Sequence, residues 1–164
     1  MSEAAERKRR SSLKVVNVRL VKEPSLYSDE KIMTPEDAVH VVANELKTYD
    51  RECFAILSLK TSGKPINLNV VSIGTLDSSL VGPRETFKAA ILSNAAAVIA
   101  IHNHPSGNID PSHEDIMITE RLVKAGQILG IPVMDHIIVG GETGTMLSMN
   151  RMGYMDRDSK DWER

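Results

Sequence analysis

The chain has 164 residues, of which 41% are hydrophobic and 26% charged, and its formal net charge is −2. This length predicts one domain with a real core, and the near-neutral charge argues against a strongly basic nucleic-acid-binding domain. Apolar runs fall short of the ~20 residues that cross a bilayer and no secretory signal is recognised, so we expect a cytoplasmic protein with no membrane association. The single cysteine, Cys53, agrees with a reducing compartment.

The first segment, residues 1–12, is polar and contains four consecutive basic residues, Arg7, Lys8, Arg9 and Arg10. We predict a disordered basic arm. Because no aromatic side chains alternate with the basic ones to stack on bases, we expect at most weak phosphate contacts with nucleic acid.

A strand, a helix and a hairpin are predicted next. Apolar alternation predicts a strand over 13–21. Thr34, Pro35 and two following acids are typical of a helix N-terminus, and this helix should run to about Thr48 with His40 at the surface. Two paired strands are predicted over 52–59 and 66–73. The inward helix face should consist of Val39, Val42, Ala43 and Leu46.

Strands and helices alternate in the second half of the chain. A helix is expected from Pro83 to about Asn94, with Phe87, Ala90 and Ile91 inward, followed by a buried strand over 95–101. A second helix is expected over 112–129, with Gly130 after its end, and its inward residues are Ile116, Thr119, Leu122, Val123 and Gly126. Two strands, over 131–139 and 145–149, complete the prediction. Residues 13–150 are therefore predicted to form one α/β domain, a single mixed sheet with about three helices on its two faces, followed by a polar tail over 151–164.

The chemistry is concentrated after the buried strand over 95–101. His102 and His104 are two residues apart, so an extended backbone presents both imidazoles on one side. Ser112 and Asp115 have the spacing of a helix N-cap and an acid three positions later, which places Asp115 in the first helical turn, facing back toward the loop. Two histidines and one carboxylate form the ligand set of a catalytic zinc site, with one position open for water. The sequence therefore predicts one Zn²⁺ per chain.

This pattern resembles the JAMM signature of the JAB/MPN+ metallopeptidases. The wording around His102 and the later stretch 129–136 look like the bacterial RadC-like branch, and the resemblance covers roughly residues 35–150. It implies a sheet similar to that of the cytidine deaminases and a zinc-dependent peptidase or isopeptidase acting on a protein or peptide substrate. Asn103 stands where eukaryotic members usually have Ser or Thr.

Amide hydrolysis also needs a base beside the metal. Glu52, Glu85, Glu114 and Asp110 are all candidates by position, and the spacing does not choose among them. Glu52, followed by its apolar strand, looks like the catalytic glutamate of the family. The resemblance also implies that Ser112 donates to the oxyanion of the reaction, beside its role as an N-cap.

Other readings of the same residues fit less well. His113 points away from Asp115, and His136 is expected to be a packed strand residue rather than a fourth ligand. A zinc deaminase would need His-x-Glu and Pro-Cys-x-x-Cys, which are absent from the sequence. The remaining alternative is a DNA-associated accessory module with little or no catalysis. The sequence leaves the substrate and the bond type open.

Overall fold

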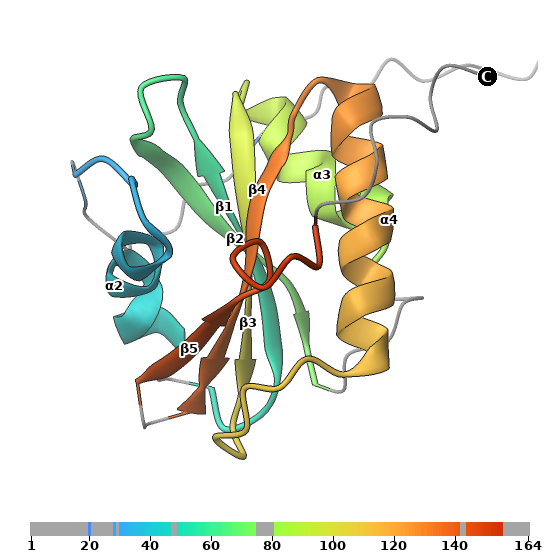
Figure 1. Ribbon diagram of the computed structural model, residues 1–164. Helices are drawn as coiled ribbons and strands as arrows, with labels where there is room; N and C mark the ends of the chain where they lie inside the picture. The colour runs from blue at the N-terminus through green and yellow to red at the C-terminus, as the bar shows by residue number, and fades with distance from the viewer. Residues whose placement is uncertain are drawn as a thin grey trace, which may run out of the picture.

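A computed structural model describes residues 20, 28, 30–46, 49–74, 81–141 and 144–155. Within these residues, five strands form one sheet in the order β2-β1-β3-β4-β5 (Figure 1). The strands are β1 (Cys53–Leu59), β2 (Pro65–Ile73), β3 (Ala97–His104), β4 (Val133–Gly140) and β5 (Thr145–Ser148), and the helices are α2 (Pro35–Leu46), α3 (Pro83–Leu92) and α4 (His113–Leu129).

The sheet is mixed. β1 pairs antiparallel with both β2 and β3, and β5 pairs antiparallel with β4. β3 and β4 are parallel, and α4 is the crossover between them. The predicted α/β class and single mixed sheet are therefore confirmed. Since β3 and β4 run in the same direction, the loops that follow them meet at the same edge of the sheet.

Helices cover the two faces of the sheet, α2 on one side and α3 and α4 on the other (Figure 1). Each face has its own core: Ala38, Val42 and Leu46 of α2 pack on one, and Phe87 of α3 and Leu122 of α4 pack on the other. All residues of β1 are buried, because this strand lies inside the sheet with a helix layer on each face. Such double burial explains its continuous apolar sequence.

Some predicted core positions are wrong because two helices are rotated about their axes relative to the prediction. Ile91 is 50% exposed, because α3 turns Thr86, Phe87, Ala89 and Ala90 inward instead. In α4, Ile118 is fully buried whereas Ile116 and Val123 are only half-buried. Periodicity predicts that a helix has an apolar stripe, but the neighbouring layer decides how the helix is rotated about its axis.

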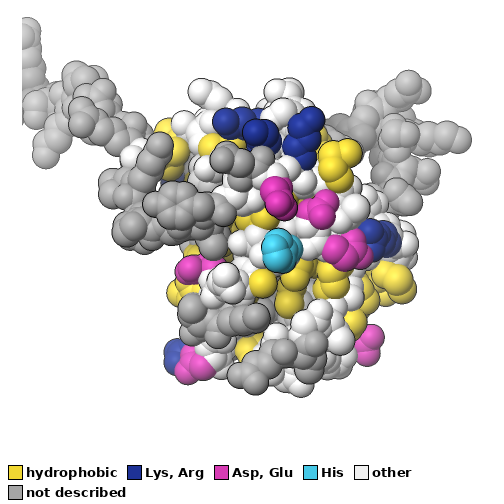
Figure 2. Space-filling model, turned by 90° about the vertical axis from the view of Figure 1, so that its left-hand side faces the viewer, with side chains coloured by type: hydrophobic (Ala, Val, Ile, Leu, Met, Phe, Trp, Pro, Cys, Tyr) yellow, Lys and Arg dark blue, Asp and Glu magenta, His cyan; other side chains and the backbone are white. Residues whose placement is uncertain are grey.

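The predicted N-terminus of the first helix is present. Asp37 N–H donates to Thr34 Oγ1 over 3.2 Å, and Thr34 N–H donates to Asp37 Oδ2 over 2.8 Å. His40 is exposed, as expected. Figure 2 views the side of the molecule that carries α2, where Lys and Arg side chains gather at the upper rim and acidic and apolar side chains lie below. This face therefore carries charges of both signs.

Three predicted features fall outside the described residues. These are the basic arm, the strand over 13–21 apart from Leu20, and the tail from residue 156 onward. Arg151, at the start of the predicted tail, forms a two-pronged ion pair with Glu36 of α2. Among the helices that the structure describes, none is long and apolar enough to cross a membrane.

Candidate metal centre

His102 and His104 belong to the end of β3 itself. The strand runs to His104, three residues beyond the predicted end at Ile101, because the backbone of these residues pairs with β4 as far as Gly140. As the alternation predicts, both imidazoles lie on one side, with ring centres 4.5 Å apart. His102 is 1% exposed, and the His104 side chain is 12% exposed. The strand therefore presents one buried and one more accessible imidazole.

Asp115 is brought back to the histidines by the start of α4. Ser112 caps the helix: Asp115 N–H donates to Ser112 Oγ over 3.1 Å, while Ser112 N–H and Oγ–H donate to Asp115 Oδ2 over 2.7 and 2.6 Å. This reciprocal arrangement is the predicted capping box. Gly107 has φ 83°, which lets the preceding loop turn sharply. The local sequence thus fixes the Asp115 carboxylate in one orientation.

The Asp115 carboxylate faces both imidazoles. Its Oδ1 lies 3.1 Å from His102 Nδ1, and its Oδ2 lies 3.6 Å from His104 Nε2. Although the first distance is short, both atoms lack a hydrogen-bond partner, as does His102 Nε2. Burial by itself raises the pKa of Asp115, but contacts with His102, His104 and Ser112 outweigh it and hold that pKa well below its ordinary range. A buried carboxylate facing a buried imidazole without a hydrogen bond fits a pair that shares a cation.

The tautomer of a neutral His104 follows from its other contact. Nδ1 of His104 lies 2.6 Å from the carbonyl oxygen of Asn108. A carbonyl can only accept, so Nδ1 carries a proton and Nε2 of the neutral ring is left as the lone-pair atom on the side of Asp115. The nearby Asp115 carboxylate raises the pKa of His104, while burial acts in the opposite direction. A loop carbonyl thus selects the nitrogen that is available to a metal.

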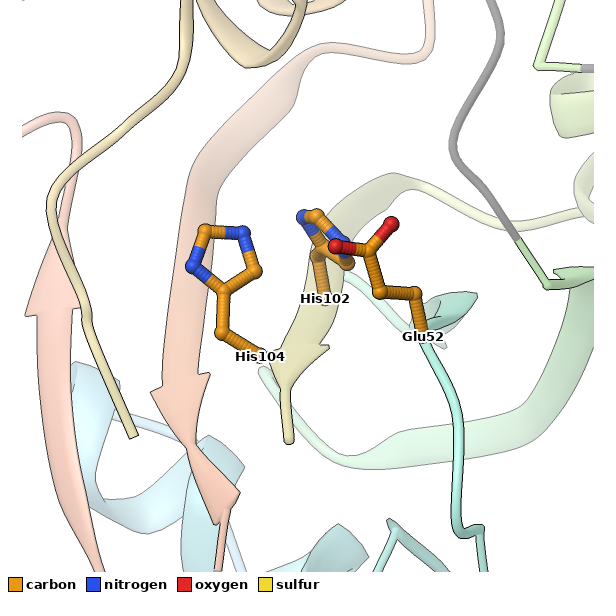
Figure 3. A group of neighbouring side chains, drawn as sticks. All are labelled: Glu52, His102 and His104. Atoms are coloured by element: carbon orange, nitrogen blue, oxygen red, sulfur yellow. The ribbon is translucent and has the colours of Figure 1, made fainter. Parts of the chain in front are cut away.

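Glu52 reaches the same place from the position immediately before β1, which begins at Cys53, one residue later than predicted. One carboxylate oxygen of Glu52 and one nitrogen each of His102 and His104 all lie within 4.8 Å of one another. Figure 3 shows the polar ends of these three side chains converging on the same space. Within the described residues, neither Glu85, Glu114 nor Asp110 joins this group, and Glu85 is paired with Arg84 at 3.0 Å. Asp115 is not part of this group of three, but its carboxylate faces the same two imidazoles, and Ser112 is bonded to it.

Asn103, between the two histidines, holds the backbone that carries Glu52. Its side chain points to the opposite side of β3 and lies beside β1, where its Oδ1 accepts from Cys53 N–H over 2.5 Å and its Nδ2 donates to Arg51 C=O over 3.2 Å. Gly74 N–H also donates to the Glu52 carbonyl over 2.8 Å. Sequence reasoning missed this role, since it depends on the register of Cys53 opposite Asn103 in the antiparallel pair.

His136 of β4 lies behind His102 and is fully buried, as expected of a packed strand residue. Its ring centre is 6.2 Å from that of His102 and 5.5 Å from that of Phe54. Burial lowers the pKa of His136 to about 3, with a further contribution from His102. This imidazole is therefore neutral at ordinary pH.

Two imidazoles and two carboxylates thus lie together at the carboxyl end of β3. A domain with this arrangement can bind a metal ion. A family model described as RadC-like JAB domain matches residues 32–154, and the chain belongs to this family.

Similar proteins include several named UPF0758 protein. That of Caldanaerobacter subterraneus subsp. tengcongensis is 44% identical over 125 residues, which cover 76% of this chain and 53% of the relative. That of Desulforamulus reducens is 50% identical over 116 residues, or 71% and 51% of the two chains. That of Methanosarcina acetivorans is 44% identical over 125 residues, or 76% and 54%. The chain thus spans about half the length of these curated relatives, and the name they share states no activity.

Proposed function

We propose that the chain is a zinc-dependent amide hydrolase of the JAMM metallopeptidase type, acting on a peptide or isopeptide bond. The observation that carries this proposal is the arrangement around His102: a buried imidazole and a buried carboxylate oxygen face each other at 3.1 Å without a hydrogen bond, beside His104 and Glu52. JAB domains include metallopeptidases, which supports the same assignment at the level of the family.

The proposed metal ligands are His102, His104 and Asp115. Imidazole and carboxylate donors without a thiolate suit Zn²⁺, and three protein ligands are typical of a catalytic rather than a structural zinc site. When bound, zinc would act as a Lewis acid that lowers the pKa of a water molecule to about 7 and so supplies a nucleophile at neutral pH. His104 is the most accessible of the three ligands, so substrate would approach from its side.

Glu52 is proposed as the general base. Its carboxylate is half-buried next to both imidazoles, so it can take a proton from the attacking water and deliver it to the departing amine. Ser112 donates its hydroxyl proton to Asp115, so its first proposed role is to orient that carboxylate. Donation by Ser112 to the oxyanion remains a prediction from the family resemblance, and it would require the hydroxyl to rotate away from Asp115.

The experiment compares metal content with hydrolysis. Elemental analysis of purified protein should find about one zinc per chain in the wild type and little in His104→Ala or Asp115→Ala. Glu52→Gln should retain zinc and lose hydrolysis of a library of peptide and isopeptide amides. His40→Ala is the matched control, because this histidine is exposed on α2, and it should change neither property.

The outcomes separate the possible roles. Wild-type protein that holds no transition metal and whose melting temperature does not rise with added zinc would refute the proposal. Loss of zinc in Glu52→Gln would make Glu52 a ligand rather than the base. Selective DNA binding at physiological salt that persists in the metal-site variants, in the absence of any hydrolysis, would favour the accessory-module reading instead.

A further inference from the structure

A buried hydrogen-bond chain links α4 to β4 directly behind the candidate metal centre. Thr119 Oγ1 lies 2.6 Å from the backbone carbonyl oxygen of Asp115 and 2.6 Å from Nδ1 of His136. Thr119 and Asp115 are each 1% exposed and His136 is 0% exposed. Water therefore does not compete for these contacts, and their protons must be accounted for within the protein.

The chain of contacts defines one tautomer of His136. Thr119 has a single hydroxyl proton. The Asp115 carbonyl can only accept, and at 2.6 Å it is a better acceptor than the Met149 sulfur at 3.4 Å, so this proton lies between the two oxygens. His136 Nδ1 must then be the donor to Thr119 Oγ1. The opposite tautomer would leave two oxygens 2.6 Å apart without a proton between them and would bury an unpaired N–H at Nε2, which has no hydrogen-bond partner in the structure.

The imidazole of His136 also packs against the ring of His102. Its ring and that of His102 are inclined by only 29°, with centres 6.2 Å apart, and Phe54 meets His136 edge-on. His136 therefore contacts His102 through its ring and Asp115 through Thr119. These are the two buried residues of the proposed ligand set.

We propose that His136 is a positioning residue for the metal centre: as its Nδ1–H tautomer it holds Thr119, which fixes the first turn of α4 and with it the distance between Asp115 and His102. The inference rests on the proposed function, since it concerns the geometry of the proposed ligands. Groups behind metal ligands commonly change metal affinity by about 10–100-fold when they are removed.

The first test needs no metal. Long-range ¹H–¹⁵N NMR spectra of the metal-free wild-type protein at neutral pH should show His136 protonated at Nδ1 and bare at Nε2. The Thr119→Ser variant, which keeps the hydroxyl, should show the same pattern. A His136 protonated at Nε2, or at both nitrogens, would overturn the inference whatever the activity of the protein.

The second test measures zinc affinity by competition with a chromophoric chelator. Thr119→Val has nearly the same shape but no hydroxyl, so it should bind zinc about 10-fold more weakly than wild type, whereas Thr119→Ser should stay close to wild type. The matched control is Thr86→Val, because Thr86 is equally buried and its hydroxyl has no hydrogen-bond partner in the structure. This control should bind zinc like the wild type.

Two failures are distinguishable. If wild-type protein binds no zinc, the proposed function fails and this inference falls with it. If wild type and Thr119→Val bind zinc equally tightly, only the role of His136 and Thr119 is refuted. If the Thr119→Val protein does not fold, the NMR tautomer of His136 is the deciding measurement.

Discussion

Replacing Asn103 by Leu should destabilise the protein because Asn103 joins β3 to the segment that carries Glu52. Leu keeps the branching of Asn but has neither its acceptor nor its donor. Two hydrogen bonds would be lost, from Cys53 N–H at 2.5 Å and to Arg51 C=O at 3.2 Å. The two losses differ in cost, because Cys53 is fully buried whereas Arg51 is exposed.

The magnitude follows from what each freed backbone group can do. The Arg51 carbonyl can accept from water, so its loss should cost a few tenths of a kcal/mol. The Cys53 N–H is enclosed, and a buried donor without a partner costs about 1–3 kcal/mol. We therefore expect a loss of about 2 kcal/mol, which for a domain of this size lowers the melting temperature by roughly 4–8 °C.

Urea denaturation of metal-free protein measures this loss, and hydrogen exchange locates it at the Cys53 amide. Asn67→Leu is the matched control, because Asn67 Oδ1 in β2 has no hydrogen-bond partner in the structure, so the same substitution removes no satisfied acceptor. An Asn103→Leu protein within about 0.5 kcal/mol of the Asn67→Leu protein, with a Cys53 amide that exchanges as slowly as before, would refute the reasoning.

Three further outcomes are expected. Gly140→Ala would place its Cβ 2.8 Å from the Gly107 carbonyl, so it should cost about 1–3 kcal/mol and weaken zinc binding by displacing the loop, as seen by denaturation and chelator competition. Burial, with the charge of Glu45, raises the pKa of the Cys53 thiol from 9.0 to about 11. Because the folded state keeps this proton to a higher pH than the unfolded state, the stability of the wild type relative to Cys53→Ala should be constant below pH 9. Between pH 9 and pH 11 it should fall by about 1.4 kcal/mol per pH unit. Arg151→Gln should let the pKa of Glu36 rise from about 2 toward its ordinary value in an NMR titration, with little change in melting temperature because the pair is exposed.

The placement of His102, His104 and Asp115 could be predicted because it depends on local rules. Alternation along β3 puts His102 and His104 on one side, and the capping box of α4 turns Asp115 back toward them. These rules act within a single continuous segment. Glu52 comes from a distant segment, immediately before β1, and only the family resemblance singled it out among the acids that the sequence offered.

The supporting residues could not be predicted because they depend on register between separate strands. Asn103 meets Cys53 only because β1 and β3 pair with these residues opposite each other. His136 meets Thr119 only because α4 is packed across β4 at one particular rotation. The same rotation explains why Ile118, and not Ile116 or Val123, is fully buried in α4.

The continuous segment from β3 to α4 has a consequence for the order in which the protein folds. His102, His104 and Asp115 need only one short loop to meet, whereas bringing Cys53, and with it Glu52, to β3 closes a loop of 50 residues. Contacts that close long loops form slowly, because the chain loses more entropy before they are made. On the proposed function, zinc should therefore be captured during refolding before hydrolytic activity returns. Partial capture by the unfolded chain should also make zinc less stabilising than its native affinity alone implies.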